Sequence, residues 1–216
     1  MTSLSGSPKW IDADELLSII EKSADGKNRF LVAIAGPPGS GKSTIAEILE
    51  KRLGTSAAVL PMDGFHLEND RLTEMGLLHR KGAPETFDAE GFVELVASLR
   101  DHETVHFPTF DRATDRTVPK SGCIEAMTKI ILVEGNYLLL DRPPWSELPQ
   151  LFDLSVCLVV DRDELKSRLI QRWIDHGLSK RSAHERAEAN DMINADLIAD
   201  NLLEPTCFLR SAALSK

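Results

Sequence analysis

Cysteine is scarce in this sequence, which argues against a framework held together by disulfides. The three cysteines, Cys123, Cys157 and Cys207, are scattered, odd in number and never in C-x-x-C spacing. Such usage favours reduced thiols in a cytoplasmic protein. Cys157 lies within an apolar run and is therefore expected to be a small core residue.

Basic residues are also in deficit. The chain has 25 lysines and arginines against 34 aspartates and glutamates, which gives a net charge of −9. Non-specific binding to DNA or RNA depends on an excess of cations, and anionic membrane surfaces also attract basic segments. The composition therefore argues against nucleic-acid and membrane partners.

Long apolar runs, internal repeats and low-complexity tracts are absent as well. The most apolar stretch, residues 130–140, is broken by Glu134, Gly135 and Asn136, so we expect no membrane-spanning segment. The amino terminus lacks the basic start and the apolar core that are typical of a secretory signal. With 216 residues, the chain is long enough for one α/β domain and short for two. We expect a single domain over residues 1–216.

One nucleotide-binding motif is complete. Residues 36–44 read GPPGSGKST, which matches the phosphate-loop pattern G-x-x-x-x-G-K-[ST]. An apolar run at 30–35 predicts a buried strand before it, and residues 44–53 predict an amphipathic helix after it. In this arrangement, backbone N–H groups and a helix N-terminus converge on a polyphosphate. The expected nucleotide-binding residues are Gly36, Pro37, Pro38, Gly39, Ser40, Gly41, Lys42, Ser43 and Thr44.

Each specified position of this motif has a chemical task. The glycines allow a close approach of the backbone to the phosphates. Lys42 would reach the β- and γ-phosphates, and the Ser43 hydroxyl would ligate Mg²⁺. The alternative is a Gly/Pro-rich turn with a chance lysine, which is rare when all four specified positions stand between a strand and a helix. We therefore expect the chain to bind a nucleoside triphosphate, ATP, together with Mg²⁺.

Strands and helices alternate along the rest of the chain. Further strands are predicted at 57–60, 129–133 and 154–160, and a hairpin at 104–118. Helices are predicted at 12–23, 163–175 and 182–196. One more helix is expected to begin directly after Asp88, which caps it. Apolar residues recur with neither a helix nor a strand period in residues 66–87, so no regular element is predicted there. This alternation predicts a doubly wound parallel α/β sheet of the P-loop NTPase type, with helices on both faces and a small lid. Ligands are expected outside the carboxyl ends of the strands.

Acidic side chains follow three of the predicted strands. Beside a bound triphosphate, Asp63 is placed to accept a hydroxyl proton from an acceptor substrate, although a turn aspartate before Gly64 is the alternative. His66 is the competing base, or a hydrogen-bond partner of the substrate. Glu134, at the end of an apolar strand, has the pattern of a carboxylate linked to Mg²⁺. Asp161 is expected instead to cap the helix that follows it.

Basic residues gather between positions 166 and 186. Arg168 and Arg172 are four residues apart and therefore share a helix face. Interleaved acidic residues favour a solvated, salt-bridged surface. The alternative is a mobile lid over about residues 172–186, whose arginines close over the transferring phosphoryl group. Gly177, at the break between two predicted helices, favours motion there.

The motifs together resemble a known family. GPPGSGKST, PMDGFH, RKGAPETFD, FPTFDR, ILVEGNYLLL, RW-x-x-HG and NDMINADLI occur in the order found in the uridine kinase, phosphoribulokinase and type I pantothenate kinase family. The resemblance covers about residues 10–205. Within the family, the chain looks most like bacterial kinases connected with fructose transport systems.

The resemblance implies roles for individual residues. Asp63 matches the family's catalytic base, Glu134 its Mg²⁺-linked carboxylate and Arg172 its lid arginine. The positions that shape the acceptor pocket in relatives are held here by Arg80, Lys81, Phe110 and Arg112, and His66 is expected to contact the same substrate. Asn190, Asp191 and Asn194 match polar positions of the family for which helix capping or a core network is an equal alternative.

The sequence therefore predicts an ATP-dependent kinase that phosphorylates a hydroxyl of a small polar metabolite. A sugar such as fructose is the first expected acceptor, and nucleosides and pantothenate-like compounds come next. Phe110 and Arg112 stand where pantothenate kinases carry a tyrosine and a histidine, and Gly64-Phe65-His66 replaces the Ser-Phe-Tyr of uridine kinases. An acceptor that bears a carboxylate or phosphate also stays open. The rival is an ATP-binding regulatory or accessory protein linked to a transporter, and a homodimer is left open.

Overall fold

The structure is a computed structural model that describes residues 9–101 and 104–210. The expectation that the chain begins without a secretory signal falls mainly on residues 1–8, which lie outside the described residues, as do the two ends of the expected domain. In the described part of the chain, no helix combines the length and the apolarity that are needed to cross a membrane.

The elements alternate much as the apolar pattern predicts. The strands are β1 (Lys9–Ile11), β2 (Phe30–Ala35), β3 (Ala57–Pro61), β4 (Val105–Asp111), β5 (Arg116–Ile124), β6 (Ile130–Gly135), β7 (Leu154–Val159) and β8 (Cys207–Arg210). The helices are α1 (Ala13–Ala24), α2 (Lys42–Leu53), α3 (Asn69–Glu74), α4 (Ala89–Ser98), α5 (Arg162–Asp175), α6 (Lys180–Arg186) and α7 (Met192–Asp200). A π-helical turn, Ala187–Asp191, joins α6 to α7, and a 3₁₀ turn, Met62–Phe65, follows β3.

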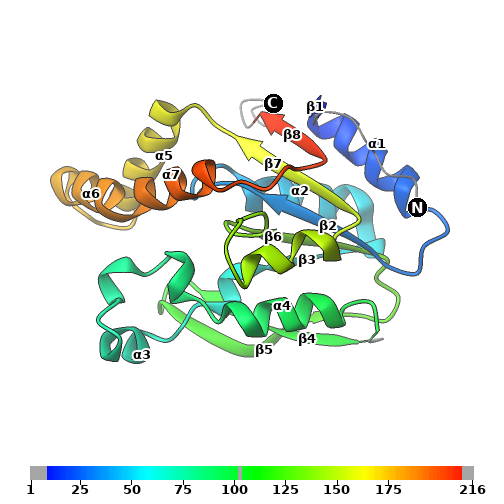
Figure 1. Cartoon of the computed structure of the whole chain (residues 1–216), viewed down its shortest axis with the longest axis horizontal. Helices are drawn as coiled ribbons and strands as arrows, with labels where there is room; N and C mark the ends of the chain where they lie inside the picture. The colour runs from blue at the N-terminus through cyan, green and yellow to red at the C-terminus, as the bar shows by residue number, and fades with distance from the viewer. Residues whose placement is uncertain (1–8, 102–103, 211–216) are drawn as a thin grey trace.

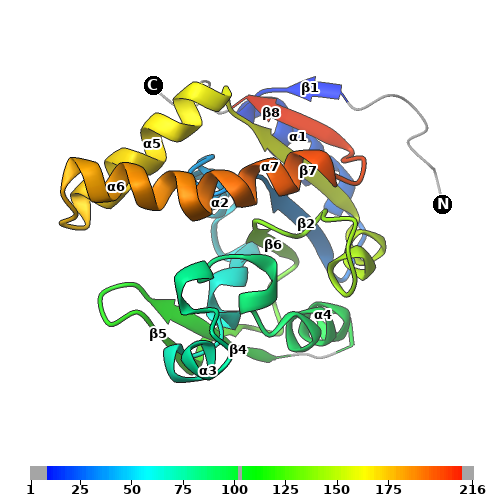
Figure 2. The same ribbon diagram turned by 60° about the vertical axis from the view of Figure 1, so that its left-hand side comes forward.

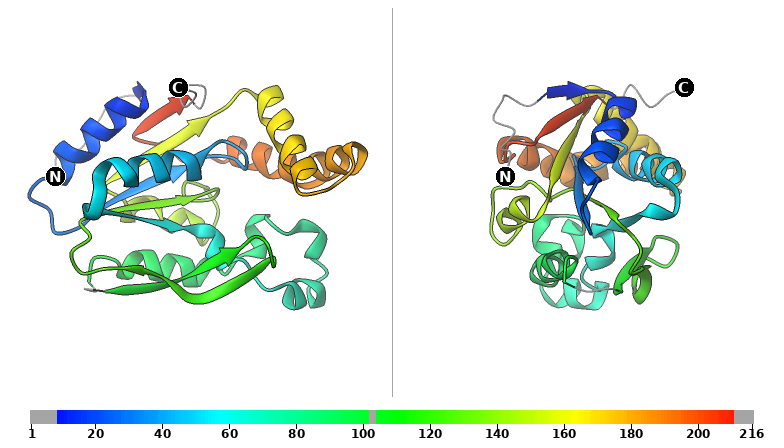
Figure 3. Two further views of the ribbon diagram at one scale, coloured as in Figure 1. Left: turned by 180° about the vertical axis from the view of Figure 1, so that it is seen from behind. Right: turned by 90° about the vertical axis from the view of Figure 1, so that its right-hand side faces the viewer.

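Six strands form one parallel sheet in the order β1-β8-β7-β2-β6-β3 (Figure 1). Helices α1 and α2 cover one face, as the view from behind shows, and α4 lies on the opposite side (Figure 3). Strands β4 and β5 form a separate antiparallel hairpin beside α4. The doubly wound α/β fold expected from the sequence is confirmed.

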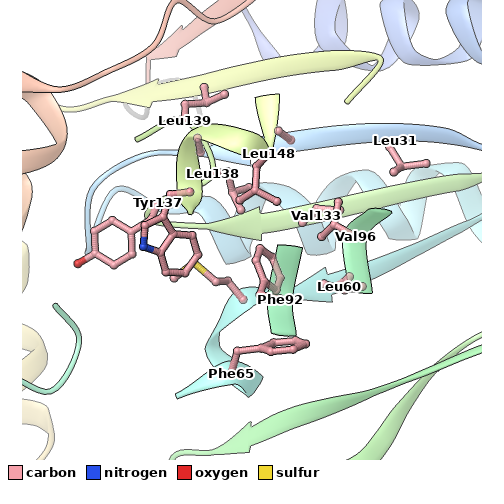
Figure 4. Close-up of a cluster of buried hydrophobic side chains, with 14 of the residues drawn as sticks. Leu31, Leu60, Phe65, Phe92, Val96, Val133, Tyr137, Leu138, Leu139 and Leu148 are labelled. Atoms are coloured by element: carbon pink, nitrogen blue, oxygen red, sulfur yellow. The ribbon is translucent and has the colours of Figure 1, made fainter. Parts of the chain in front are cut away.

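Strand β2 explains why the central strands are apolar throughout. Phe30, Val32 and Ile34 face the cluster formed with α1 and α2, whereas the alternate residues of the strand face the cluster on the other side. That second cluster contains Phe92 and Val96 of α4 together with side chains from the loop after β6 (Figure 4). Because successive strand residues point to opposite faces, a strand covered on both sides must be apolar at every position.

The structure differs from the sequence expectations mainly at the periphery of the fold. The apolar pattern of the sequence did not predict the edge strands β1 and β8 or the short helix α3. The hairpin continues to Ile124 rather than ending at Val118. The predicted caps are confirmed: the Asp88 side chain accepts from the backbone N–H of Gly91, and the Asp161 side chain accepts from two N–H groups of the first turn of α5. In both helices, the capping aspartate stands four residues ahead of the first buried apolar side chain, Phe92 in α4 and Leu165 in α5.

The 3₁₀ turn after β3 packs directly against the hairpin. A Cβ atom on Gly64 would lie 1.9 Å from the carbonyl oxygen of Pro108. Because backbone cannot move aside as a flexible side chain can, we expect Gly64→Ala to lower the free energy of unfolding by roughly 1–3 kcal/mol or more. Urea unfolding measures the loss. Gly91→Ala is the control, since the nearest atoms to a Cβ there belong to the Asp88 side chain, which can rotate away at the loss of one capping hydrogen bond. An equal or larger loss in Gly91→Ala would contradict this account.

Candidate active site

A cavity of about 780 Å³ opens beyond the carboxyl ends of the parallel strands. The phosphate loop, the turn after β3, the end of β6, the tip of the β4–β5 hairpin and the α5–α6 segment all contribute to its walls. The expected site residues that line it are Pro38, Gly39, Gly41, Lys42, Ser43, Thr44, Asp63, His66, Lys81, Phe110, Arg112, Glu134 and Arg172. Four other expected residues, Gly36, Pro37, Ser40 and Arg80, lie outside this lining.

The phosphate loop is shaped by its glycines. Gly39 and Gly41 have φ angles of +78° and +93°, which residues with a side chain rarely adopt. Gly41 is the N-cap of α2, and no side chain in the described part of the chain caps this helix start. The first N–H groups of α2 are therefore available at the positive end of a twelve-residue helix, which suits a polyphosphate.

Lys42 is buried at the base of the cavity. Its Nζ donates to the carbonyl oxygen of Pro37 at 3.0 Å and to Oδ1 of Asn136 at 2.7 Å. Burial lowers the pKa of Lys42, while the charges of Glu134 and Asp63 act in the opposite direction. The ammonium group is thus held over the loop, within the field of two carboxylates.

Ser43 and Glu134 contact each other at the start of α2. The Ser43 hydroxyl donates to Oε1 of Glu134 at 3.1 Å, and Glu134 is buried. Burial raises the pKa of Glu134, against the opposing charge of Lys42. Within the described residues there is no group of three or more His, Cys, Asp or Glu side chains that could hold a metal alone.

This donor set fits Mg²⁺ in a nucleotide site. Mg²⁺ prefers oxygen ligands and is usually bound through one or two carboxylates together with phosphate oxygens and waters. A hydroxyl and a carboxylate in contact, at the start of a phosphate-binding helix, are of that type. In addition, the buried Ser40 hydroxyl of the same loop has no hydrogen-bond partner among the described residues.

Asp63 lies in the 3₁₀ turn after β3, with 32% of its side chain exposed. Its Oδ2 accepts from Nη2 of Arg112, at the tip of the hairpin, at 3.1 Å. This ion pair joins two walls of the cavity across 49 residues of sequence. The structure therefore places the candidate base in the same cavity as Lys42, and its side chain is directed to the hairpin rather than to its own turn.

His66 belongs to the part of the cavity lining that also contains Lys81, Phe110 and Arg112, which we call the acceptor wall. Its ring stacks on Phe87 with centroids 4.1 Å apart and contacts Phe110 at 4.8 Å. Its Nδ1 is buried and has no hydrogen-bond partner in the described part of the chain. Burial lowers the pKa of His66 to about 4, although the charge of Asp63 opposes this shift. The imidazole is therefore neutral at physiological pH.

The lowered pKa of His66 predicts a pH dependence of stability. In the unfolded chain, histidine titrates near 6.5, so between pH 6.5 and pH 4 the unfolded state binds one more proton than the folded state. The stabilisation is complete above pH 6.5 and is lost as pH falls through this window. Between pH 7.5 and pH 5, we expect His66 to account for about 2 kcal/mol of lost stability. Urea unfolding of wild type and His66→Gln at both values measures the difference, and equal losses in the two proteins would contradict the assignment.

Lys81 and Arg80, two other residues expected at the acceptor wall, lie in different places. Lys81 lines the cavity, where its Nζ bonds Oδ1 of Asn69 at 2.7 Å and Oδ1 of Asp115 at 2.9 Å and lies over the ring of Phe110. Arg80 points away from the cavity, and its guanidinium donates to side-chain oxygens of α7 and of the π-helical turn. The structure therefore does not bring Arg80 to the acceptor wall.

The basic segment contains surface ion pairs and also one arginine that lines the cavity. Arg168 pairs with Glu164, Lys166 with Glu188 and Arg181 with Glu185, as expected of a salt-bridged surface. Arg172 differs because it lines the cavity, and its Nη2 bonds Oδ1 of the buried Asp191 at 3.3 Å.

Several cavity residues were missed by sequence reasoning. Asn136 binds Lys42, Asp115 binds Lys81, and Trp173 lies in the wall beside Arg172. A polar residue just after the apolar strand β6 was a usable signal for Asn136. The others had none, because a tryptophan or a charged residue in a helix or turn is commonplace until its neighbours are known.

The chain is similar to known proteins over most of its length. The sequence profile described as the Phosphoribulokinase / Uridine kinase family matches residues 31–192. A crystal structure of a protein provisionally named a fructose transport system kinase, from Silicibacter sp. TM1040, is 42% identical with a TM-score of 0.87, covering 92% of this chain and 98% of that one. A protein of Schizosaccharomyces pombe, provisionally named a uridine kinase, is 35% identical over 215 residues, 93% of this chain and 91% of its own length.

A third relative extends the likeness at the level of the fold. The crystal structure of YFH7 from Saccharomyces cerevisiae, provisionally named a P-loop containing kinase with a circular permutation, has a TM-score of 0.78 at 19% identity and covers 92% of this chain and 97% of its own. The family profile spans the phosphate loop, Asp63, the hairpin, Glu134 and Arg172. The chain belongs to the phosphoribulokinase/uridine kinase family of P-loop kinases.

Proposed function

We propose that this protein transfers the γ-phosphoryl group of ATP to a hydroxyl of a small polar metabolite. One observation carries the proposal: a single cavity is lined by Lys42 and Ser43 of the phosphate loop, by Asp63 with its partner Arg112, and by Lys81. A triphosphate on the loop and a substrate on the acceptor wall would then meet at Asp63. Phosphoryl transfer depends mainly on such positioning and on electrostatic stabilisation.

The residues of the site have distinct tasks in this proposal. Lys42 and the first N–H groups of α2 hold the phosphates, and Asp63 accepts the proton of the acceptor hydroxyl as that oxygen attacks. Ser43 and Glu134 would hold Mg²⁺, which supplies neutralisation of phosphate charge. Arg172 stabilises charge that develops on the transferring group.

A sugar such as fructose is the first candidate acceptor, because of the name carried by the Silicibacter relative. Nucleosides and pantothenate-like compounds follow, the former because of the name of the fission-yeast relative. The polar side chains of the acceptor wall support a polar acceptor of any of these classes, since an apolar one would leave buried polar groups unpaired at about 1–3 kcal/mol each. Arg112 keeps an acceptor with a carboxylate or phosphate among the candidates, because its guanidinium is 62% exposed toward solvent.

We further propose that residues 1–216 act as one cytoplasmic domain, in which residues 63–118 form the acceptor-binding excursion and about residues 172–186 the lid. The ion pair between Arg112 and Asp63 supports the first assignment, because it joins the tip of the excursion to the candidate base. The cavity-lining position of Arg172 and Arg186 supports the second.

A coupled assay for ADP formation, run over free sugars, sugar phosphates, nucleosides and pantothenate, tests the proposal. Acceptor-dependent turnover is expected for at least one compound. Binding of MgATP with only slow, acceptor-independent hydrolysis across the whole panel would favour the rival function, an ATP-dependent accessory protein linked to a transporter. Activity on a nucleoside and on no sugar would support the kinase proposal but show that fructose is not the acceptor.

A further inference from the structure

Three polar side chains are buried where the helical hairpin of α5, α6 and α7 meets the rest of the molecule (Figure 2). Asn190, Asp191 and Asn194 are 2%, 5% and 1% exposed, and the first two belong to the π-helical turn. Buried polar groups are retained only when their hydrogen bonds are made. A π-helical turn also changes the direction in which its side chains project, and such turns occur often at functional sites.

Asp191 faces the end of α5. Its Oδ2 accepts from the indole Nε1 of Trp173 at 2.5 Å, and its Oδ1 accepts from the guanidinium of Arg172 at 3.3 Å. The indole ring in turn has the guanidinium carbons of Arg172 and Arg186 each at 5.2 Å from its centroid. One carboxylate therefore fixes both the arginine that lines the cavity and the aromatic side chain on which it rests.

Asn190 faces the acceptor wall. Its Nδ2 donates to the carbonyl oxygen of Lys81 at 2.8 Å, and its Oδ1 accepts from Arg80 at 2.9 Å. Asn194 accepts from the same guanidinium at 3.3 Å. This explains why Arg80 points away from the cavity: it holds the segment that carries Lys81 against the π-helical turn.

We propose that Asp191, which itself lies in the cavity lining, is a positioning residue. It holds Arg172 in the cavity through its ion pair and through Trp173, and Asn190 ties this arrangement to the segment that carries Lys81. The inference rests on the proposed function. Adjacent residues of one helical turn contact two separate parts of the molecule, α5 through Asp191 and the Lys81 segment through Asn190. The position of Arg172 is therefore set relative to the segment that carries Lys81. Without Asp191, the arginine keeps its charge but loses its defined place.

Asp191→Asn tests this directly, because it keeps the size of the side chain and removes its charge. In the wild type, Arg172 and Trp173 donate to two different oxygens of the Asp191 carboxylate. An amide replaces one of these oxygens with a donor NH₂ group, so it cannot reproduce both contacts at their present positions. We expect kcat for MgATP hydrolysis without acceptor to fall roughly tenfold or more, while KM for MgATP changes less than about twofold. Asp196→Asn on the same helix is the matched control, since Asp196 pairs with Arg162 at the surface, and wild-type kinetics are expected there.

A double-mutant cycle separates positioning from general destabilisation. In an Arg172→Ala background, Asp191→Asn should have no further effect on kcat, because the group that it positions is gone. Additive losses would overturn the inference and leave Asp191 a merely structural residue. Wild-type kinetics in Asp191→Asn would overturn it as well.

Trp173 provides a readout that does not depend on turnover. Its emission, isolated by subtracting the spectrum of Trp173→Phe, should differ between wild type and Asp191→Asn because the indole N–H loses its carboxylate partner. Identical spectra would overturn the inference. Absence of MgATP binding to the wild-type protein would instead defeat the proposed function, and the spectra would still decide whether Asp191 holds Trp173.

Discussion

Replacing Lys42 with alanine is expected to abolish phosphoryl transfer and to weaken ATP binding. Lys42 is the buried cation at the base of the cavity, held by the Pro37 carbonyl and by Asn136. Without it, the triphosphate loses its principal positive partner among the side chains of the loop. The buried Glu134 also loses the positive charge that favours its ionised form, so its pKa, which burial already raises, should rise further.

Two measurements check this expectation. Isothermal titration with a non-hydrolysable ATP analogue gives the loss of affinity, and the ADP-coupled assay gives the loss of turnover. Lys51→Ala, which removes an exposed lysine from the last turn of the same helix, is the control and should behave as wild type. Hydrolysis or transfer at the wild-type rate in Lys42→Ala would refute the assignment of residues 36–44 to the nucleotide.

Asp63→Asn should separate binding from chemistry. The substitution leaves the phosphate loop intact, so the nucleotide should bind with near-normal affinity. Transfer should fall by roughly 10²–10⁴, which is the usual contribution of general acid–base catalysis. The same variant also frees Arg112 from its ionised partner, so any change in KM for the acceptor reports on that ion pair.

The possible results for Asp63→Asn are distinct. Near-normal turnover would move the role of base to His66, or to no residue. Loss of ATP binding would indicate that Asp63 mainly organises the metal and the phosphates. Asp70→Asn is the control, because Asp70 is an exposed acidic residue of the same excursion that does not line the cavity.

The features that sequence reasoning predicted correctly are local ones. The phosphate loop was readable because glycines with positive φ, a lysine and a helix start follow one another within nine residues. The central strands were readable because burial on both faces demands continuous apolar runs. The caps at Asp88 and Asp161 depend on bonds to N–H groups two or three residues away, so they too are encoded in a short window.

The edge strands show where such reasoning ends. Strands β1 and β8 have three and four residues, and neither forms a long apolar run. Lys9 pairs with Cys207 and Ile11 with Leu209, almost two hundred residues away along the chain. A strand this short is defined by its partner rather than by its own propensity, because its stability comes from the pairing and packing that the folded sheet provides.

The candidate site also has features that follow from local sequence and features that depend on long-range contacts. The sequence by itself determined which residues could bind a triphosphate and which acidic side chains end the strands, because these depend on motif spacing and on the polarity of strand ends. Only the tertiary structure decided that Arg112 pairs with Asp63, that Arg80 turns to Asn190 and Asn194, and that Asp191 holds Arg172. These contacts join side chains 19 to 114 residues apart. Their geometry follows from how α7, the hairpin and the excursion pack around one sheet edge, which no local pattern specifies.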